Sequence, residues 1–442
     1  MKLTDGQNFR ISSRRLMTEL GARFPARVLD LLRVAMGFYV ADRLQKRDRR
    51  HPNGPSRDLK VDLPVIDVDF WRSTGITDLL VEIIELLCGD AAFPSFRQHR
   101  NKIEFQRPLF AEPWTPIDVV VPYSGGLDSA GGLASRLCRD DGLSRATVTA
   151  CHQSGLRKIV RGQLDAFQQI TGRKTPGLFV RASLINAPRM SEQELTQRCR
   201  GLLFMSLAGI VATQLGAHTV EIYENGIGAF NLPPMAGMAL CGRSTRGCHP
   251  RFLRMMSELV SEVAGRPIQF ILPFQNLTKA ELVSEMTGNP RFEEIARSTV
   301  SCVHFPRRAS KKQCGVCPGC LGRRQALKIA RIDDPGSAYE HDIFSGSSAL
   351  DRIPSEKLSY LKVTLLDVHK LQSLLEAGPP IRISSHIYGT SIAKVGEPIE
   401  SWLKLLSRHR DEWCRLATEA TDAGTAWGNW WPLSNRARRS AA

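Results

Sequence analysis

The sequence predicts an α/β protein whose core is a doubly wound parallel sheet. From about residue 116, strand-like and helix-like segments alternate, which is the pattern of repeated βαβ units. Apolar runs in this region, such as 119–121, are bounded by turns, as expected for strands buried on both faces. The flanks lack the alternation. We therefore predict an N-terminal α+β extension (1–115), the core (116–335) and a mainly helical C-terminal extension (336–442).

The N-terminal part is expected to mix helices and strands. Val28, Leu31, Leu32 and Ala35 form an apolar stripe at helical spacing. A charged segment rich in proline and glycine, 46–55, reads as an exposed loop. The other elements expected here are a strand at 62–70, a helix at 77–87 and a strand at 103–110.

In the core the expected elements alternate strictly between the two types. The strands are predicted at 117–122, 146–151, 177–180 and 219–223. The helices are predicted at 129–139, 158–171 and 195–216, with two further helices in the C-terminal part at 361–377 and 397–420.

Composition indicates an ordinary globular protein. Apolar residues make up 42% and charged residues 24% of the 442 residues. The first fifteen residues contain no apolar segment of the kind found in secretory signals. The most apolar stretch, 202–217, is shorter than the roughly 20 residues that span a bilayer. We expect a cytoplasmic protein without a membrane partner.

The net charge of +16 favours acidic partners, namely nucleotides, nucleic acid or an acidic protein surface. The basic residues are spread along the chain without interleaved aromatics, which favours a basic surface that binds no nucleic acid over one that does. The cysteine count is odd, at 11. A disulfide framework is therefore not expected.

A phosphate-binding loop is predicted between the first core strand and the first core helix. Its residues are Ser124, Gly125, Gly126, Leu127, Asp128 and Ser129. The two glycines let backbone N–H groups approach an anion, and the helix that follows presents its positive end there. The serines add hydroxyl donors, while Asp128 is expected to cap the helix and to help hold Mg²⁺. No Gly-Lys-Ser/Thr follows, so this is not a Walker loop. The alternative is a plain strand-to-helix turn.

Four cysteines have the spacing of a metal site. Cys302 lies upstream of Cys314, Cys317 and Cys320, and four thiolates close a tetrahedral shell around Zn²⁺ with no open position, so the site is structural. Gly315 and Gly319 allow the tight turns, and Lys311, Lys312, Arg323 and Arg324 are expected to offset the anionic charge. Three alternatives stay open: His304 replacing Cys302, an iron–sulfur cluster, and free thiols.

Loop and cysteine motif together carry a family resemblance. The Ser-Gly-Gly-x-Asp-Ser string resembles the N-type ATP pyrophosphatase (PP-loop) superfamily. With the cysteines it resembles the QueC family of 7-cyano-7-deazaguanine synthases, and more closely the QueC-like proteins of anti-phage defence operons, the QatC group of the Qat system. The matching segments lie between about 120 and 330. Besides loop and cysteines they are Arg200–Ala208, Glu224–Gly226 and Pro273–Glu281.

The resemblance implies that ATP is cleaved between its α- and β-phosphates. The loop would hold the leaving pyrophosphate while a substrate carboxylate becomes an acyl-adenylate. Ammonia would then give the amide, and a second ATP would dehydrate it to the nitrile. The implied cofactors are ATP, Mg²⁺ and Zn²⁺. The implied catalytic residues are Asp128, Ser129, Lys279 and Arg200, and His249 is a further candidate for binding charge.

The sequence also departs from the synthases. Where they have an Asp-Tyr-Gly-Gln string after the second strand, this chain has Cys151 to Gly155, and no acid follows Gly226 closely. We therefore expect adenylation of a carboxy-deazaguanine-like acid, with nitrile, amide or a conjugate to a protein amine as product and with protein partners from the same defence operon. One rival is a tRNA-modifying PP-loop enzyme, favoured by the basic tail at 436–439 but opposed by the lack of a separate catalytic cysteine pair outside the motif. The other rival is a non-catalytic ATP-sensing scaffold.

Overall fold

The computed structural model describes most of the chain. The described residues are 1–47, 56–99, 105, 114–139, 141–151, 155–185, 188–189, 192–194, 196–231, 246–303, 312–346, 351–376 and 399–428. Several sequence predictions concern residues outside these ranges, namely most of the loop at 46–55, most of the strand at 103–110, 152–154, His304, Lys311 and the tail at 436–439.

A six-stranded sheet forms the centre of the molecule, in the order β1-β6-β5-β4-β7-β8. Its strands are β1 (Phe9–Ile11), β4 (Val119–Pro122), β5 (Arg145–Cys151), β6 (Gly177–Leu184), β7 (Thr219–Glu221) and β8 (Gln269–Ile271). All neighbours pair in parallel except β1, which lies antiparallel on β6. The predicted mostly parallel sheet is confirmed, and its edge strand comes from the N-terminal part.

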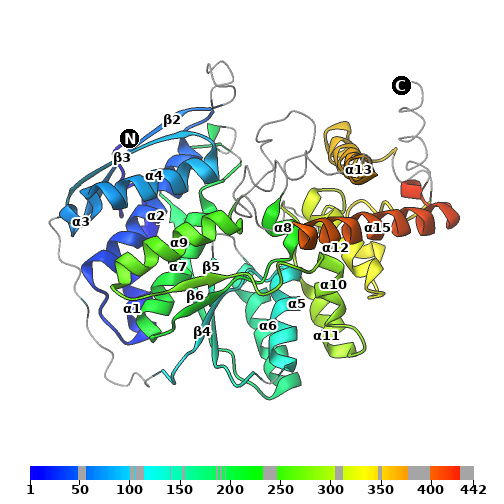
Figure 1. Ribbon diagram of the computed structural model, residues 1–442, viewed down its shortest axis with the longest axis horizontal. Coiled ribbons are helices and arrows are strands. Elements are labelled where there is room, and N and C mark those ends of the chain that lie inside the picture. Colours follow the sequence, from blue (N-terminus) through cyan, green and yellow to red (C-terminus); the bar gives the residue numbers. More distant parts are fainter. Residues whose placement is uncertain are drawn as a thin grey trace.

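Helices cover both faces of this sheet (Figure 1). One layer contains α5 (Leu127–Cys138), α6 (Leu156–Thr171), α10 (Lys279–Ser284) and α11 (Pro290–Ser298). The other contains α2 (Ala26–Leu44), α4 (Thr74–Cys88), α7 (Arg200–Leu215) and α9 (Pro250–Ala264). Strand residues alternate between the two layers: Val120 belongs to the core under α7, whereas Val119 and Val121 belong to the core under α5. This alternation makes the sheet doubly wound.

The remaining N-terminal elements pack beside α2. They are α1 (Ser13–Leu20), β2 (Asp58–Val65), α3 (Val68–Arg72) and β3 (Ala91–Gln98), with β2 and β3 forming a separate parallel pair. The strand predicted at 62–70 ends early, at Val65. The reason is that the Asp67 side chain accepts a hydrogen bond from the backbone N–H of Phe70 and so starts α3.

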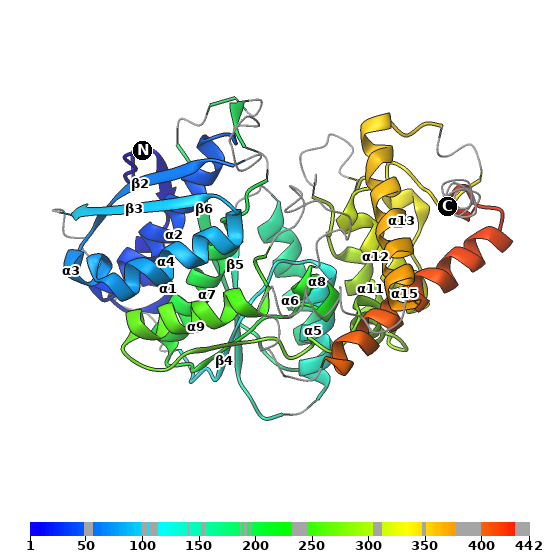
Figure 2. The ribbon, with the colours of Figure 1, turned by 45° about the horizontal axis from the view of Figure 1, so that its top comes forward.

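In the C-terminal part, beyond residue 335, the described elements are the 3₁₀ turn η2 (Gly336–Ala338) and the helices α13 (Ser355–Glu376) and α15 (Glu400–Asp422). These two helices pack against α12 (Pro318–Ile329) of the core, and α15 also contacts α8 (Gly226–Phe230). Figure 2 shows α12, α13 and α15 gathered at the end of the molecule opposite β2 and β3. Phe230, Leu371 and Leu405 join α8, α13 and α15 in one small apolar core. None of the described helices is long and apolar enough to cross a membrane.

Candidate functional site

The predicted loop forms a tight turn at the carboxyl end of β4. Gly125 has φ of +74°, and a side chain there would come 2.9 Å from Val160, so the turn needs glycine on both grounds. The two serine hydroxyls lie together, with Ser124 Oγ 2.9 Å from Ser129 Oγ. The carbonyl of Gly125 accepts hydrogen bonds from the Val300 N–H and from the Gln163 side chain. Helix α6 and the segment around residue 300 therefore both hold the loop in place.

Asp128 does not cap the helix, contrary to the sequence prediction. Gly126 occupies the N-cap of α5 and no side chain caps it. The Asp128 carboxylate instead accepts hydrogen bonds from Asn225 Nδ2, at 2.7 Å, and from Lys279 Nζ. Burial disfavours the ammonium of Lys279, but the charges of Asp128 and Glu224 outweigh this and raise its pKa. The loop and the segment Pro273–Glu281, which carries Lys279, therefore meet at one ion pair.

Glu224 and Asn225 complete this polar cluster from the carboxyl end of β7. Asn225 caps α8, where its side chain accepts from the Gly228 N–H. Its amide nitrogen also donates to Glu224 Oε1 at 2.9 Å. Burial, and secondarily the charge of Asp128, raise the pKa of Glu224 to about 8. Two carboxylates and a lysine therefore stand at the edge of the sheet where parallel α/β folds bind ligands.

A cavity of about 140 Å³ opens directly on the loop. We call it the loop pocket. Ser124, Ser129 and Glu224 line its polar side, and apolar side chains including Val148, Leu156 and Phe204 line the rest. Arg200 lies beside it, with its guanidinium 5.6 Å from the centre of the Phe204 ring. Arg200 is thus near the loop pocket but is not part of the Asp128–Lys279 cluster.

A second cavity of about 310 Å³ lies between the core and the C-terminal helices. We call it the helix pocket. Asn225 and Lys279 line it on the core side, and α12, α13 and α15 supply Gln325, Asp367 and Trp413 among others. Because Glu224 lines one pocket and Asn225 the other, the polar cluster around Asp128 forms the partition between them.

Helix α15 is bonded to the segment that carries Lys279. Glu412 accepts hydrogen bonds from the hydroxyl of Thr278, the N-cap of α10, and from Gln325 Nε2 at 2.9 Å. Arg408 pairs with Glu281, the third residue of the same capping box, at 2.6 Å. Helix α15 of the C-terminal part therefore helps to fix the start of α10, which carries Lys279.

We expect Glu412→Gln to stabilise the protein above neutral pH. Burial raises the pKa of Glu412 to about 7, so the folded state prefers the protonated carboxyl. The folded protein then loses stability as pH rises from the unfolded pKa of about 4.3 to about 7, by at most about 4 kcal/mol. An uncharged amide avoids this loss. Urea unfolding at pH 5 and pH 8 should show the larger gain at pH 8, and a gain independent of pH would contradict the assignment.

His249 has a structural position. Its ring nitrogen Nδ1 accepts from the Arg251 N–H at 3.2 Å, so the side chain caps α9. Burial and neighbouring arginines lower its pKa to about 3, which leaves it uncharged at neutral pH. A neutral, capping imidazole is a poor binder of anionic charge, and the structure does not support that role.

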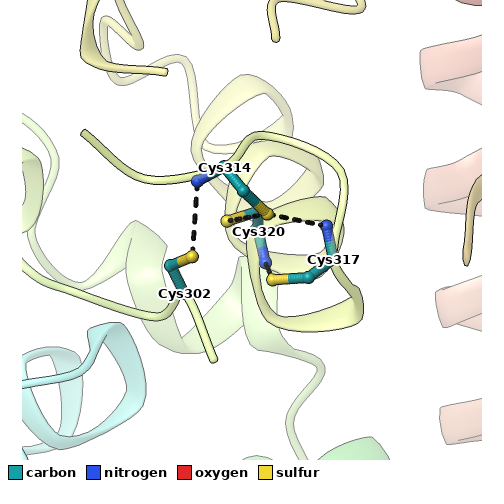
Figure 3. Close-up of side chains that lie close together, drawn as sticks. All are labelled: Cys302, Cys314, Cys317 and Cys320. Carbon is teal, nitrogen blue, oxygen red and sulfur yellow. Dashed lines mark hydrogen bonds between the residues drawn. The ribbon is translucent and has the colours of Figure 1, made fainter. Parts of the chain in front are cut away.

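The four predicted cysteines come together (Figure 3). All are buried, and their sulfurs lie within 4.8 Å of one another. Cys314 Sγ is 3.8 Å from Cys320 Sγ, which is about the edge of a tetrahedron with Zn–S bonds of ~2.3 Å. Backbone N–H groups of Cys314, Cys317 and Cys320 point at the sulfurs of Cys302, Cys314 and Cys317, respectively, at 3.2 to 3.4 Å. The donor set fits a structural Zn²⁺ site.

The local backbone explains how these sulfurs converge. Gly315 has φ of +82°, as the predicted tight turn requires, and Cys317 starts α12 as its N-cap. The side chains of Arg323 and Arg324 hydrogen-bond to Tyr339 and to Asp334. Their expected role in offsetting the thiolates stays a prediction.

The structure also shows a cysteine pair that the sequence did not reveal. Cys88, at the end of α4, and Cys199, just before α7, place their sulfurs 2.6 Å apart, beside Asp42. Both are fully buried; burial raises the pKa of the Cys88 thiol, and the contact with Cys88 together with burial raises that of Cys199. Protonated, inaccessible thiols are poor nucleophiles. This pair lies outside the four-cysteine motif and lacks catalytic character.

Of the four predicted catalytic residues, the structure brings Asp128, Ser129 and Lys279 to one edge of the sheet and sets Arg200 beside the loop pocket. Sequence reasoning missed Glu224 and Asn225 as members of the cluster. A signal was present, because both lie within four residues of the end of β7, and the carboxyl ends of parallel strands share one edge.

Comparison with known proteins adds independent evidence. Residues 178–331 match the family model described as "Queuosine biosynthesis protein QueC". This range includes Glu224, Lys279 and the four cysteines but not the loop. The 7-cyano-7-deazaguanine synthase of Anaeromyxobacter sp. (strain Fw109-5) is 30% identical in an alignment of 247 residues that covers 49% of this chain and 94% of the relative. That of Alcanivorax borkumensis is 26% identical in an alignment of 239 residues that covers 49% of this chain and 96% of the relative.

Proposed function

This chain belongs to the QueC family, and from that premise we propose that it is an ATP-dependent enzyme that adenylates the carboxylate of a carboxy-deazaguanine-like acid. The observation that carries the proposal is the cluster of Asp128, Glu224 and Lys279 beside the loop, in which Asn225 donates to both carboxylates. It combines an anion-binding turn, a cation and paired carboxylates at one point, which are the groups that transfer of an adenylyl group to a carboxylate needs.

In this proposal the loop pocket receives the nucleotide. Its apolar walls suit a flat heterocycle, while the hydroxyls of Ser124 and Ser129 and the positive end of α5 suit the phosphates. Lys279 offsets the charge that develops on the departing pyrophosphate. Asp128 and Glu224 are the carboxylates available to hold Mg²⁺, which prefers carboxylate and phosphate oxygens and would neutralise phosphate charge when bound.

The reaction is proposed as an in-line transfer. A carboxylate oxygen of the acid attacks the α-phosphorus of ATP, the bond to the bridging oxygen breaks, and pyrophosphate leaves with that electron pair. An amine or ammonia then displaces AMP from the acyl carbon. We further propose a protein amine as acceptor and partner proteins from an anti-phage defence operon. The support for these two points is the sequence resemblance to QueC-like defence proteins.

Exchange of labelled pyrophosphate into ATP tests the adenylation step alone. With Mg²⁺ and 7-carboxy-7-deazaguanine, we expect label to enter ATP, because a reversible adenylation regenerates ATP from the bound acyl-adenylate. The matched control is 7-deazaguanine, which lacks the carboxylate and should support no exchange. Equal exchange with both compounds, or none with the acid, would contradict the proposal.

A further inference from the structure

The buried pair of Cys88 and Cys199 is a feature that the proposed adenylation leaves unexplained. Cys88 ends α4 in the N-terminal extension, and Cys199 is the N-cap of α7 in the core. Their sulfurs lie 2.6 Å apart, which is closer than two unbonded sulfur atoms normally approach each other. Two thiols in direct contact in the interior of a protein either share a metal ion or form a bond with each other.

The charges around the pair argue against a metal ion. Asp42 is the side chain placed to complete a metal site with the two sulfurs, but its carboxylate already pairs with two buried arginines, Arg47 and Arg57. It also accepts a hydrogen bond from the Cys199 N–H at 2.9 Å. A cation would therefore meet two guanidinium groups and only two available sulfurs, whereas zinc sites in proteins take at least three protein ligands.

We propose that Cys88 and Cys199 form a disulfide that clamps the end of α4 to the start of α7, with a small disulfide such as glutathione disulfide as the oxidant. One thiolate attacks a sulfur of the small disulfide and displaces a glutathione thiolate. The second thiolate then attacks the protein-bound sulfur and displaces the other glutathione. Overall the pair loses two electrons and two protons, and glutathione disulfide becomes two glutathione thiols.

Burial sets the rate of this exchange. The pKa of both thiols is raised, by burial for Cys88 and by the contact with Cys88, followed by burial, for Cys199. The reactive thiolate is therefore scarce, and the oxidant reaches it only when α4 and α7 separate locally. The same burial shields a formed bond from reducing thiols. We therefore expect the pair to change state slowly in both directions, unlike a catalytic pair that cycles rapidly.

The clamped junction adjoins the loop pocket. Phe204, one turn into α7, lines that pocket. The start of α7 is closely packed, because a Cβ at Gly201 would come 2.7 Å from Gly247 and 3.5 Å from Leu87 of α4. Cys248, next to Gly247, also lines the loop pocket. The disulfide would therefore hold α4 against the segments that form one wall of this pocket.

Peptide mapping of the whole protein tests the bond. The wild-type protein is incubated for many hours with glutathione disulfide, unfolded in urea with N-ethylmaleimide to block free thiols, and digested with trypsin without reduction. We expect residues 73–97 joined to residues 199–200, in a product that dithiothreitol separates. Cys88→Ala should not form this product, and the matched control Cys138→Ser should retain it. Recovery of both cysteines as maleimide adducts, or as separate glutathione adducts, would overturn the proposal.

Amide hydrogen exchange of the oxidised and reduced wild-type proteins tests the clamp, and it requires no variant to fold. Amides in the last turn of α4 and the first two turns of α7 should exchange at least roughly tenfold more slowly after oxidation, because a bond that closes a long loop opposes separation of the two helices. Amides of α6, on the other face of the sheet, should show no such slowing. Equal exchange of α4 and α7 in both states would overturn the clamp even if the bond forms. Neither measurement involves ATP, so both are decisive whether or not the proposed adenylation holds.

Discussion

Replacing Asp128 with alanine is expected to lower the rate of acid-dependent pyrophosphate exchange about a thousandfold. The carboxylate holds both Asn225 and Lys279 at the first turn of α5, so its loss removes a proposed Mg²⁺ ligand and frees the lysine that faces the pyrophosphate. Removing a single group that stabilises transition-state charge typically costs ~10²- to 10³-fold, and Asp128 serves two such groups. Exchange rates at saturating ATP measure the effect.

Two variants show whether the loss is specific. Ser129→Ala removes one loop hydroxyl and should cost less, about tenfold to a hundredfold, since the backbone donors remain. Asp165→Ala removes an exposed carboxylate on α6 and should leave exchange unchanged. Wild-type exchange in Asp128→Ala would contradict the assigned site. If the wild-type protein protects cells from phage, and both site variants lose exchange but protect equally well, an ATP-sensing scaffold explains this protection better than catalysis does.

The parts of this site that the sequence predicted are those encoded locally. The loop at 124–129 needs only a strand, two glycines and a helix start, all within a dozen residues. The same holds for the cysteine motif, in which three ligands lie within seven residues. The parallel sheet followed from repeated alternation, which does not depend on any single boundary being right.

The parts that it missed depend on contacts between distant segments. Glu412 reaches Thr278 across 134 positions, and no local pattern on α15 indicates that partner. The prediction that Asp128 caps α5 was wrong for a related reason. The Asp128 carboxylate accepts a hydrogen bond from Asn225, which lies 97 positions away in the sequence. The absence of an acid soon after Gly226 is, in the sequence, a departure from the synthases. The structure shows that Glu224, before the turn, places a carboxylate beside Asp128.

Substituting Cys317 with serine is expected to abolish the accumulation of soluble protein. Structural zinc contributes about 10 to 16 kcal/mol to folding in zinc-finger peptides, which matches or exceeds the total stability of about 5 to 15 kcal/mol of a typical protein. The sulfurs of the site belong to the same apolar cluster as Trp413 and Trp427, so loss of the metal would also loosen the packing of α12 against α15. Metal analysis of the wild-type protein should find about one zinc per chain.

The choice of Cys317 isolates the metal from other causes. Cys317 is the N-cap of α12, and serine is among the best N-caps, so the helix start is preserved and only the thiolate is lost. Cys138→Ser is the matched control, because Cys138 is exposed at the end of α5 and should remain soluble with its zinc. Soluble Cys317→Ser protein with undiminished zinc would show that this sulfur is not a ligand. Iron with a visible absorbance band in the wild-type protein would instead identify an iron–sulfur cluster, since zinc, a d¹⁰ ion, gives no such band.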